Sequence, residues 1–343
     1  MGKDFKKIAI IGAGKYGTAL CVVLMENETF DLEIVFLTRL EEKAKEINTL
    51  RTLSGIAEGV TFTANVSATT EAAVALNNAD AVLLCTPTQA VPDFFETHKA
   101  QIEPKTVILN TTKGMIVKTG KLVHEAHEES FPGRLDRYAA LSGPSFADET
   151  YKRMPTLVTI ASTSNSTLDF LQELVCCSHF KCYTSNDLKG VELSGCLSRV
   201  ITMGAGFVVG LGYGPNSIAG VITRGIHEMQ ILLKNFGGDI QTMMGLAGIG
   251  DLMLCCYGSL SRNRACGMRV AKGEKVDDVI KSIGTVEGIT TLRVLYKMIQ
   301  EKRLEEQLPV FYSIYQLIHE HWNFTEAHQY LMKNRMQSED EFL

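Results

Sequence analysis

Three glycines near the start of the chain have the spacing of a phosphate-binding loop. Residues 7–20 read KIAIIGAGKYGTAL, so Gly12, Gly14 and Gly17 form G-x-G-x-x-G between a strand-like run and a helical pattern. In such a loop the first glycine permits a tight turn, the second lets the backbone approach a pyrophosphate, and the third lets the helix pack closely on the strand. Amide dipoles at the helix start then face the anion. The motif alone also fits a plain glycine-rich turn, but its place between strand and helix favours a dinucleotide site.

The end of the second strand bears on which dinucleotide the loop would hold. It reads Leu37, Thr38, Arg39, where a site specific for NAD usually carries Asp or Glu for the ribose hydroxyl. Arg39 is suited to the 2'-phosphate of NADP, and it is equally well explained as a solvated arginine at a helix start. NAD and NADP therefore both stay open as the cofactor.

Short strands that alternate with helices must position these residues. The first half contains six apolar or β-branched runs separated by helical stretches such as Leu40–Ile47 and Thr69–Asn78, which is typical of a parallel sheet wrapped by helices. The runs are Lys7–Ile11, Leu32–Leu37, Ala81–Cys85, Thr106–Asn110, Ala139–Ser142 and Leu157–Ala161.

The pattern changes near Asp187, after which the chain is mostly helical. Apolar residues occur at three- and four-residue spacing, and glycine-rich joints separate the segments. We expect two domains, residues 1–189 and 190–343, with a ligand cleft between them. The predicted helices of the second domain are Val191–Val209, Asn216–Asn235, Val276–Ile283 and Leu292–Glu301.

Length and composition exclude several classes of protein. The 343 residues suggest two domains of roughly 150 residues each. The formal net charge of -5 argues against a nucleic-acid partner. No apolar run approaches the ~18 residues that span a bilayer, and the charged start lacks a signal-peptide core, so we expect neither membrane insertion nor secretion. Nine cysteines without a C-x-x-C motif fit neither a disulfide framework nor a zinc site, so we expect reduced thiols and no metal.

Further motifs occur in a fixed order along the chain. They are CTPTQ with Pro87, TTKG with Lys113, GPSFA ending at Ala147, GLAGIGD ending at Asp251, SRNR with Arg262 and Asn263, and VEG with Glu287. Together with the glycine loop they resemble the NAD(P)-dependent glycerol-3-phosphate dehydrogenases, from about residue 7 to about residue 331. The resemblance implies a Rossmann-type doubly wound α/β domain followed by a helical substrate domain. It also implies hydride transfer between nicotinamide and C2 of glycerol 3-phosphate or dihydroxyacetone phosphate, in a cytoplasmic homodimer.

The resemblance also implies roles for individual residues. Lys113 matches the family lysine at the substrate, and Asp251 matches the carboxylate of the active site. Arg262 with Asn263 matches the pair that holds the substrate phosphate. The cofactor contacts that it implies are Gly12, Ala13, Gly14, Lys15, Tyr16, Gly17, Thr38, Arg39, Pro87, Ala147, Arg262 and Glu287.

These residue types suit that chemistry. Hydride reduction of a ketone leaves an alkoxide, which Lys113 could stabilise and protonate while Asp251 orients the lysine or relays the proton. Arginine is planar and permanently charged, so Arg262 suits bidentate contact with phosphate. Without the family match, Lys113 and Asp251 would be interpreted as a surface salt bridge and residues 261–264 as a helix cap.

The chain departs from the family pattern at three positions. At the start of the helical domain the family reads Val-Glu and then Leu-Lys-Asn, and its lysine is normally assigned as the proton donor. Here Ser198 stands in place of the lysine and Arg199 in place of the asparagine, while Cys255 replaces a threonine four residues after the aspartate. Serine carries no charge and arginine stays protonated, so neither replaces an ammonium group that exchanges a proton.

Three interpretations of the function follow. The leading one is a working glycerol-3-phosphate dehydrogenase with a rearranged proton donor, because the phosphate and cofactor motifs persist. Loss of one general acid removes ~10²- to 10⁴-fold in rate, which leaves room for activity. The second is a related dehydrogenase for another anionic hydroxy compound, with Arg199 as a second anion clamp. The third is a nucleotide-binding regulatory protein without turnover.

Overall fold

The chain divides into two compact units in a computed structural model that describes residues 3–320 and 322–333. The first unit comprises Met1–Thr112 and Leu122–Glu192, and the second comprises Lys113–Lys121 and Leu193–Leu343. The sequence predicts a boundary after residue 189 and places 113–121 in the first domain. In the structure that segment groups with the second unit because its side chains contact that unit, as in the ion pair between Lys113 and Asp251. Residues 321 and 334–343 of the predicted second domain lie outside the described part.

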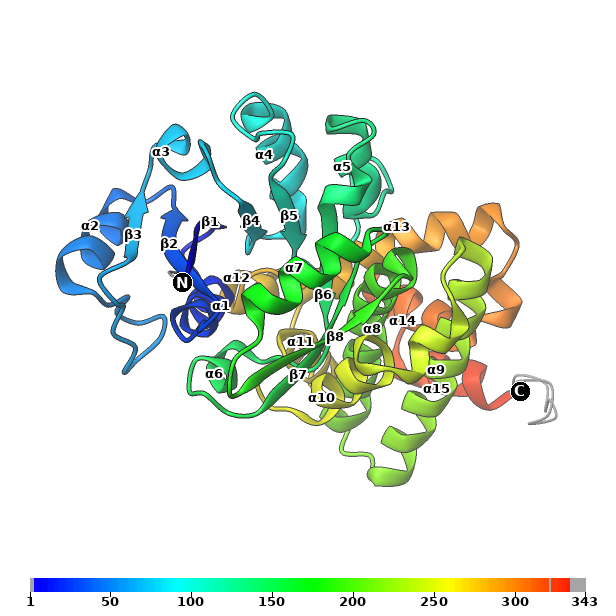
Figure 1. Cartoon of the computed structure of the whole chain (residues 1–343). Coiled ribbons are helices and arrows are strands. Elements are labelled where there is room, and N and C mark those ends of the chain that lie inside the picture. The colour runs from blue at the N-terminus through cyan, green and yellow to red at the C-terminus, as the bar shows by residue number, and fades with distance from the viewer. Residues whose placement is uncertain (1–2, 321, 334–343) are drawn as a thin grey trace. The chain divides into compact units, whose positions relative to one another are not determined.

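One eight-stranded sheet forms the centre of the first unit, in the order β3-β2-β1-β4-β5-β6-β7-β8 (Figure 1). Neighbouring strands are parallel except β6 and β7, which are antiparallel. In register, Ile8 of β1 pairs with Ile34 of β2 and with Ala81 of β4. The strands are β1 Asp4–Ile11, β2 Phe30–Leu37, β3 Val66–Thr69, β4 Ala81–Leu84, β5 Val107–Asn110, β6 Tyr138–Ser142, β7 Thr156–Ala161 and β8 Phe180–Ser185.

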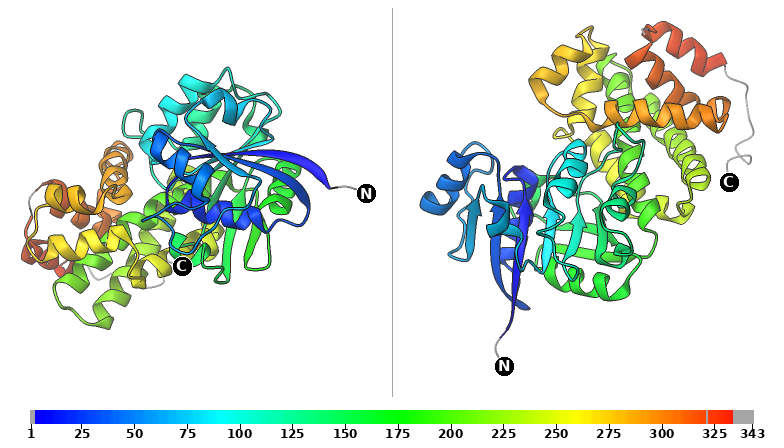
Figure 2. Two further views of the ribbon diagram at one scale, coloured as in Figure 1. Left: turned by 90° about the vertical axis from the view of Figure 1, so that its left-hand side faces the viewer. Right: turned by 90° about the horizontal axis from the view of Figure 1, so that it is seen from above.

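Helices cover both faces of this sheet. α1 packs against α6 and α7, α4 packs against α5, and the two groups lie on opposite faces (Figure 2). The inner strands β4, β5 and β6 are therefore buried along their whole length, as their continuous apolar sequences predict. The helices are α1 Lys15–Met25, α2 Glu41–Leu50, α3 Ala72–Leu76, α4 Val91–His98, α5 Val123–Ser130, α6 Ala147–Thr150 and α7 Asn165–Val175.

The predicted Rossmann-type doubly wound architecture is confirmed, with corrections in detail. All six predicted strands are present, but β3 and β8 were not predicted. The helix predicted over 69–78 was wrong at its start, because Thr69 ends β3 and α3 covers only Ala72–Leu76. An entirely parallel sheet was also wrong, since β7 runs antiparallel to β6.

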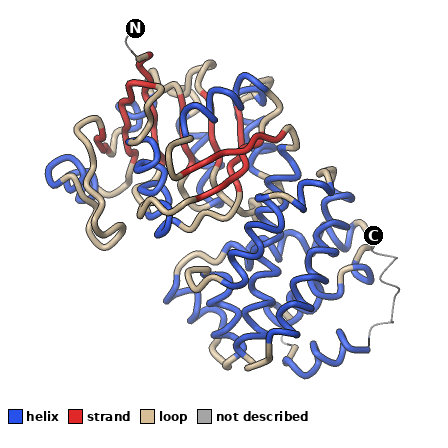
Figure 3. Tube along the Cα trace, turned by 60° about the horizontal axis from the view of Figure 1, so that its bottom comes forward, coloured by secondary structure: helices blue, strands red, loops and turns tan. Residues whose placement is uncertain are grey.

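Helices make up nearly all of the second unit (Figure 3). The predicted helices are present; α12 has the predicted bounds, whereas α13 begins at Glu287, earlier than predicted. The helices are α8 Leu188–Gly210, α9 Pro215–Phe236, α10 Asp251–Tyr257, α11 Arg262–Ala271, α12 Val276–Ile283, α13 Glu287–Glu301, α14 Pro309–His319 and α15 Phe324–Lys333. The first residues of α8 belong to the first unit and the remainder to the second.

Helix α8 is the main core helix of the second unit. By length and composition alone it could cross a membrane, whereas no such stretch is expected from the sequence. In the structure, 78% of its apolar window is buried inside the protein. Its close contact with α11 depends on two glycines: a Cβ at Gly206 would lie 2.3 Å from the Arg264 carbonyl oxygen, and one at Gly267 would lie 2.1 Å from that of Met203. Core packing therefore explains its apolar sequence.

Candidate active site

The glycine loop of the first unit shows the close contacts that its three glycines allow. Gly12 has φ +109°, and a Cβ there would lie 2.7 Å from the carbonyl oxygen of Cys85. A Cβ at Gly17 would lie 2.3 Å from the carbonyl oxygen of Gly12. A Cβ at Gly14, the N-cap of α1, would meet no atom within 4 Å. The fold therefore needs glycine at 12 and 17, whereas the space over Gly14 is open to a ligand, as a pyrophosphate-binding loop requires.

Other predicted cofactor residues follow the carboxyl ends of parallel strands. Thr38 is buried and Arg39 is exposed after β2, Pro87 is exposed after β4, and Ala147 opens α6 after β6. Because the carboxyl ends of parallel strands meet at one edge of a sheet, these residues share the edge that carries the glycine loop. The change of direction in strand order, between β1 and β4, also lies at this edge.

Two side chains of the loop are already engaged within the first unit. Lys15 Nζ lies 2.9 Å from Asp148 Oδ1, and Tyr16 Oη lies 3.1 Å from Ser145 Oγ. Both contacts tie the start of α1 to the segment after β6. The start of α1 and the segment after β6 are therefore joined within the first unit.

Lys43 is a neighbour of this loop that sequence reasoning missed. It lies on α2, and its Nζ donates to the carbonyl oxygen of Ala13 at 3.0 Å. The one available signal was its position four residues after Arg39. A lysine at this place brings a second positive charge to the edge where Arg39 was considered.

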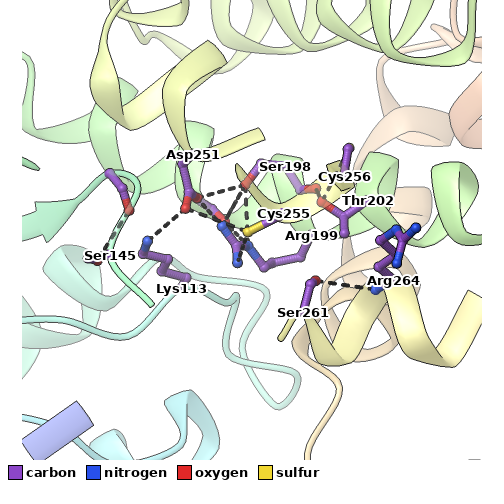
Figure 4. Close-up of polar contacts among 12 residues, drawn as sticks. Lys113, Ser145, Ser198, Arg199, Thr202, Asp251, Cys255, Cys256, Ser261 and Arg264 are labelled. Carbon is purple, nitrogen blue, oxygen red and sulfur yellow. Dashed lines mark hydrogen bonds and ion pairs between the residues drawn. The ribbon is translucent and has the colours of Figure 1, made fainter. Parts of the chain in front are cut away.

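Five predicted residues meet in a charged cluster of the second unit (Figure 4). Asp251 Oδ1 accepts a hydrogen bond from Lys113 Nζ at 3.0 Å. Its Oδ2 accepts one from Ser198 Oγ at 3.2 Å and also pairs with Arg199 Nη2. Arg199 Nη1 lies 3.1 Å from Cys255 Sγ. The Asp251 carboxylate is thus shared by two cations and a hydroxyl.

The charges of this cluster do not cancel. Burial opposes ionisation of Asp251, but the charges of Arg199 and Lys113 outweigh burial and hold its pKa below the ordinary value. Burial likewise opposes the charge on Arg199, but Asp251 raises the pKa of that guanidinium above its ordinary value. Two basic side chains therefore surround one carboxylate. Such an excess of positive charge can stabilise an anion or a developing alkoxide.

The backbone brings the cluster together from three separate segments. Asp251 is the first residue of α10 and directly follows a π-helix, η4, at Leu246–Gly250. π-helical turns are rare in proteins, and those that occur are often found at functional sites. Ser198 and Arg199 are consecutive on α8, and Lys113 opens the segment after β5 that groups with this unit.

A buried network that sequence reasoning missed supports the loop after β5. Asn110, the last residue of β5, accepts from the Thr112 backbone N at 2.9 Å and donates to Glu192 Oε1 at 3.0 Å. Glu192 also accepts from Tyr138 Oη and lies 2.7 Å from His124 Nδ1. Burial would raise the pKa of Glu192, but the hydrogen bond and charge of His124 lower it below the ordinary value. The sequence signal was the Val-Glu pair that precedes the altered lysine position.

The residues predicted to hold the substrate phosphate begin α11. Arg262 is exposed and makes no hydrogen bond or ion pair with the rest of the described chain. Asn263 is buried, and its Oδ1 accepts from the Gly288 backbone N at 2.9 Å. A Cβ at Gly288 would lie 2.8 Å from the carbonyl oxygen of Arg199, so the start of α13, with half-buried Glu287, packs on the backbone of the cluster. Asn263 thereby joins α11 to α13.

Comparison with known proteins gives two family models that together match most of the chain. The model described as NAD-dependent glycerol-3-phosphate dehydrogenase N-terminus matches residues 7–168, and the corresponding C-terminus model matches residues 187–329.

Individual relatives match over nearly their whole length. A glycerol-3-phosphate dehydrogenase (NAD(P)+) of Pediococcus pentosaceus is 35% identical, covering 97% of this chain and 99% of that protein. The protein of the same name from Syntrophomonas wolfei is 31% identical, covering 98% and 97%. The crystal structure of glycerol-3-phosphate dehydrogenase from Coxiella burnetii is similar with a TM-score of 0.88 and 29% identity, covering 96% of this chain and 99% of that one.

Proposed function

The chain belongs to the NAD-dependent glycerol-3-phosphate dehydrogenase family, and on that premise we propose how its residues interconvert glycerol 3-phosphate and dihydroxyacetone phosphate. It is an oxidoreductase that acts on a CH–OH group with NAD or NADP. When bound, the nicotinamide supplies or accepts the hydride at C2. The observation that carries the assignment of roles is the Asp251 carboxylate shared between Lys113 and Arg199.

The glycine loop and the sheet edge around it hold the dinucleotide. The open space over Gly14 and the amides at the start of α1 suit the pyrophosphate. Thr38, Arg39, Pro87 and Ala147 line the same edge. The family resemblance adds Arg262 and Glu287 to the predicted contacts. The residues present therefore fit either nucleotide.

Lys113 holds the proton that the substrate oxygen takes up on reduction. Its Nζ lies 3.0 Å from Asp251 Oδ1, so the carboxylate orients the amine. On reduction a proton passes from Nζ to the alkoxide oxygen, and solvent restores it. In the opposite direction the neutral amine accepts the hydroxyl proton.

Arg199 substitutes for the missing family lysine in charge but not in proton transfer. Arg199 is fixed on Asp251 and stays protonated, so it stabilises negative charge on the substrate oxygen electrostatically. Ser198 Oγ donates to Asp251 and fixes that carboxylate from a second side. Cys255 takes the place of the family threonine beside Arg199.

The phosphate of the substrate is assigned to Arg262, with Asn263 beside it. Arg262 is exposed, and its planar guanidinium offers two parallel hydrogen bonds. Asn263 Oδ1 is engaged by Gly288, which leaves its Nδ2 as the donor toward a ligand.

The remaining expectations concern the molecule's surroundings. We propose a cytoplasmic homodimer whose partner is a small phosphorylated substrate, with no nucleic acid and no membrane insertion. Light scattering at micromolar concentration tests the dimer, and a single 37.8 kDa species would contradict it.

Turnover of dihydroxyacetone phosphate with NADH or NADPH, followed by nicotinamide absorbance, tests the activity. Lys113→Ala should nearly abolish it, while Lys118→Ala, an exposed lysine of the same segment, should leave it unchanged. Full activity in Lys113→Ala would remove the assigned role. Tight nucleotide binding without turnover in the unaltered chain would favour the regulatory interpretation, and turnover of another phosphorylated ketone would favour the related dehydrogenase.

The altered lysine position has its own test. The double variant Ser198→Lys with Arg199→Asn restores the family pair and should raise turnover by up to the ~10²- to 10⁴-fold of a positioned acid. Ser198→Lys alone places a lysine beside Arg199, whose like charge disfavours the ammonium form. An unchanged rate in the double variant would show that Ser198 does not occupy the proton-donor position.

A further inference from the structure

Three side chains that can bind metals converge at one place in the first unit, away from the glycine loop. They are Glu26, Cys177 and His179, whose ligand atoms all lie within 4.8 Å of one another. His179 is buried, and the other two are half-buried. Cys177 Sγ lies 3.3 Å from His179 Nδ1, and the same Nδ1 lies 3.1 Å from Glu26 Oε2.

The distances from Nδ1 to the sulfur and to the carboxylate oxygen fit one metal ion bound by all three residues better than they fit a single hydrogen bond. One ring nitrogen can donate only one hydrogen, yet both the sulfur and the carboxylate approach Nδ1. With zinc bonds of about 2.0–2.3 Å and tetrahedral angles, neighbouring ligand atoms lie about 3.3–3.6 Å apart. The two distances to His179 Nδ1 are within a few tenths of an ångström of that range, and all three ligand atoms lie within 4.8 Å of one another.

The surrounding backbone holds the three residues in place. Glu26 is the C-cap of α1, and the next residue, Asn27, donates its amide to the carbonyl oxygens of Glu173 and Leu174 at the end of α7. Cys177 and His179 lie in the turn between α7 and β8, which is closed by a hydrogen bond from Cys177 N to the carbonyl oxygen of Phe180 at 2.9 Å. The group is thus built on two fixed element ends.

The two carboxylate oxygens of Glu26 have different partners, so one can pair with arginine while the other binds a metal ion. Arg153 Nε pairs with Oε1, whereas Oε2 faces His179 Nδ1. Ser178 Oγ lies 3.5 Å from Oε2 as an outer contact. A cation here also lies at the negative end of the α1 dipole, where positive charge is favoured.

We propose that Glu26 Oε2, Cys177 Sγ and His179 Nδ1 bind a zinc ion that fastens the end of α1 to the α7–β8 turn. A set of one sulfur, one nitrogen and one oxygen suits zinc rather than magnesium or calcium, and water supplies the fourth ligand. The eleven residues of α1 separate the ion from the glycine loop by about 16 Å. The ion therefore has a structural role and lies outside the dehydrogenase chemistry.

Cys176 provides a matched control. It is adjacent to Cys177 and similarly half-buried, but its Sγ accepts from the Cys182 backbone N at 3.2 Å and is not part of the group. Replacement of the two cysteines one at a time by serine separates the proposed ligand from a neighbouring thiol.

The test uses the full chain, reduced and freed of metal. Zinc is titrated in competition with a chromophoric chelator, and cobalt(II) serves as the spectroscopic probe because a bound thiolate gives it a charge-transfer absorption. The unaltered chain should bind one tight equivalent and show that absorption. Cys177→Ser should lose it and weaken zinc binding by more than the ~10- to 100-fold that loss of an outer contact costs. Cys176→Ser should match the unaltered chain.

Glu26→Gln keeps the shape of the side chain and covers the case in which Cys177→Ser does not fold. It should weaken zinc binding while cobalt keeps its thiolate absorption, and zinc should raise its melting temperature less than that of the unaltered chain. Absence of a tight equivalent in the unaltered chain, or zinc affinity in Glu26→Gln and Cys177→Ser equal to that of the unaltered chain, would overturn the proposal. Dependence on Cys176 in place of Cys177 would do so too.

Discussion

Asp251 connects every charged group of the cluster, so its replacement tests the site at the scale of one residue. Asp251→Asn leaves Lys113 and Arg199 without their shared counter-ion. We expect turnover of dihydroxyacetone phosphate to fall by at least ~10²-fold, because the amine of Lys113 is no longer oriented. Asp277→Asn, an exposed aspartate of α12, should keep full turnover. Equal rates in the two variants would contradict the role of Asp251.

The lowered pKa of Asp251 also predicts how stability depends on pH. Its pKa in the folded chain lies below the ordinary 3.8, so the ion pairs contribute fully above that value and are lost as pH falls through it toward the folded pKa. The difference in unfolding free energy between the unaltered chain and Asp251→Asn should be constant from pH 5 to 8 and shrink below about pH 4. Urea unfolding across this range measures it, and a difference that grows in acid would contradict the assignment.

The glycine loop allows binding and folding to be separated. A Cβ at position 14 meets no protein atom within 4 Å, so Gly14→Val should leave the fold intact and abolish binding of NADH and NADPH. Gly17→Ala places a Cβ 2.3 Å from the Gly12 carbonyl oxygen and should lower the melting temperature itself. Calorimetric titration and thermal melts distinguish the two effects. Unchanged nucleotide affinity in Gly14→Val would show that the pyrophosphate lies elsewhere.

At the scale of elements, the crossing of α8 and α11 positions Ser198 and Arg199 beside the start of α11. Alanine at Gly206 or Gly267 would overlap backbone of the other helix, so each substitution should cost about 1–3 kcal/mol. Gly220→Ala, at an exposed position of α9 where a Cβ meets no atom within 4 Å, should instead stabilise by about 0.5–1 kcal/mol. Thermal melts should therefore shift in opposite directions. A shared direction would show that helix propensity, and not the close crossing, decides the result.

Glu228 of α9 binds the first turn of α14, and its contribution to the unfolding free energy depends on pH. Its carboxylate accepts from the backbone N of Val310 at 2.7 Å and of Phe311 at 2.9 Å. Burial raises the pKa of Glu228 to about 8, against the lowering effect of these two hydrogen bonds and of Arg224. The folded chain therefore keeps a proton that the unfolded chain loses first.

This linkage predicts a loss of stability as pH rises. Between the ordinary pKa of 4.5 and about 8, the unfolded chain binds fewer protons at Glu228 than the folded chain, so the unfolding free energy falls with increasing pH. Glu228→Gln, which keeps an acceptor oxygen, should flatten this part of the profile. Parallel profiles for the two proteins would mean that Glu228 is already ionised in the folded state.

For the whole molecule, the sequence predicts the architecture best where strands are fully buried. The continuous apolar runs of β4 and β5 are recognisable as strands from the sequence. β3 and β8 are the two edge strands, and their sequences, VSAT and FKCYTS, are partly exposed and partly polar. An edge strand is half solvated, so its apolar period is weak. The reversal of β7 could not be predicted, because strand direction depends on pairing and not on the local pattern.

The residues of the candidate site are likewise predictable where they belong to a local motif and not where they depend on contacts between distant parts of the chain. Motifs identify Gly14, Lys113 and Asp251, since each lies within a short segment of recognisable type. They do not identify Glu192 under the loop after β5, or Glu26 beside Cys177, because these contacts join residues far apart in the chain. The absence of C-x-x-C therefore says little about a metal ligand set assembled by the fold.

The short segment 113–121 limits how the two halves of this protein can be exchanged between relatives. The chain passes from one unit to the other after residues 112, 121 and 192, so no single cut separates them. A recombinant gene joined at 192 takes Lys113 from one parent and Asp251 from the other, and a gene joined at 112 divides the sheet-bearing unit. Inheritance of the unit that carries Lys113, Ser198, Arg199 and Asp251 from one parent requires three crossovers. A single exchange therefore separates the two ion-pairing partners of one active site, and Lys113 and Asp251 from different parents must remain compatible for the hybrid to be active.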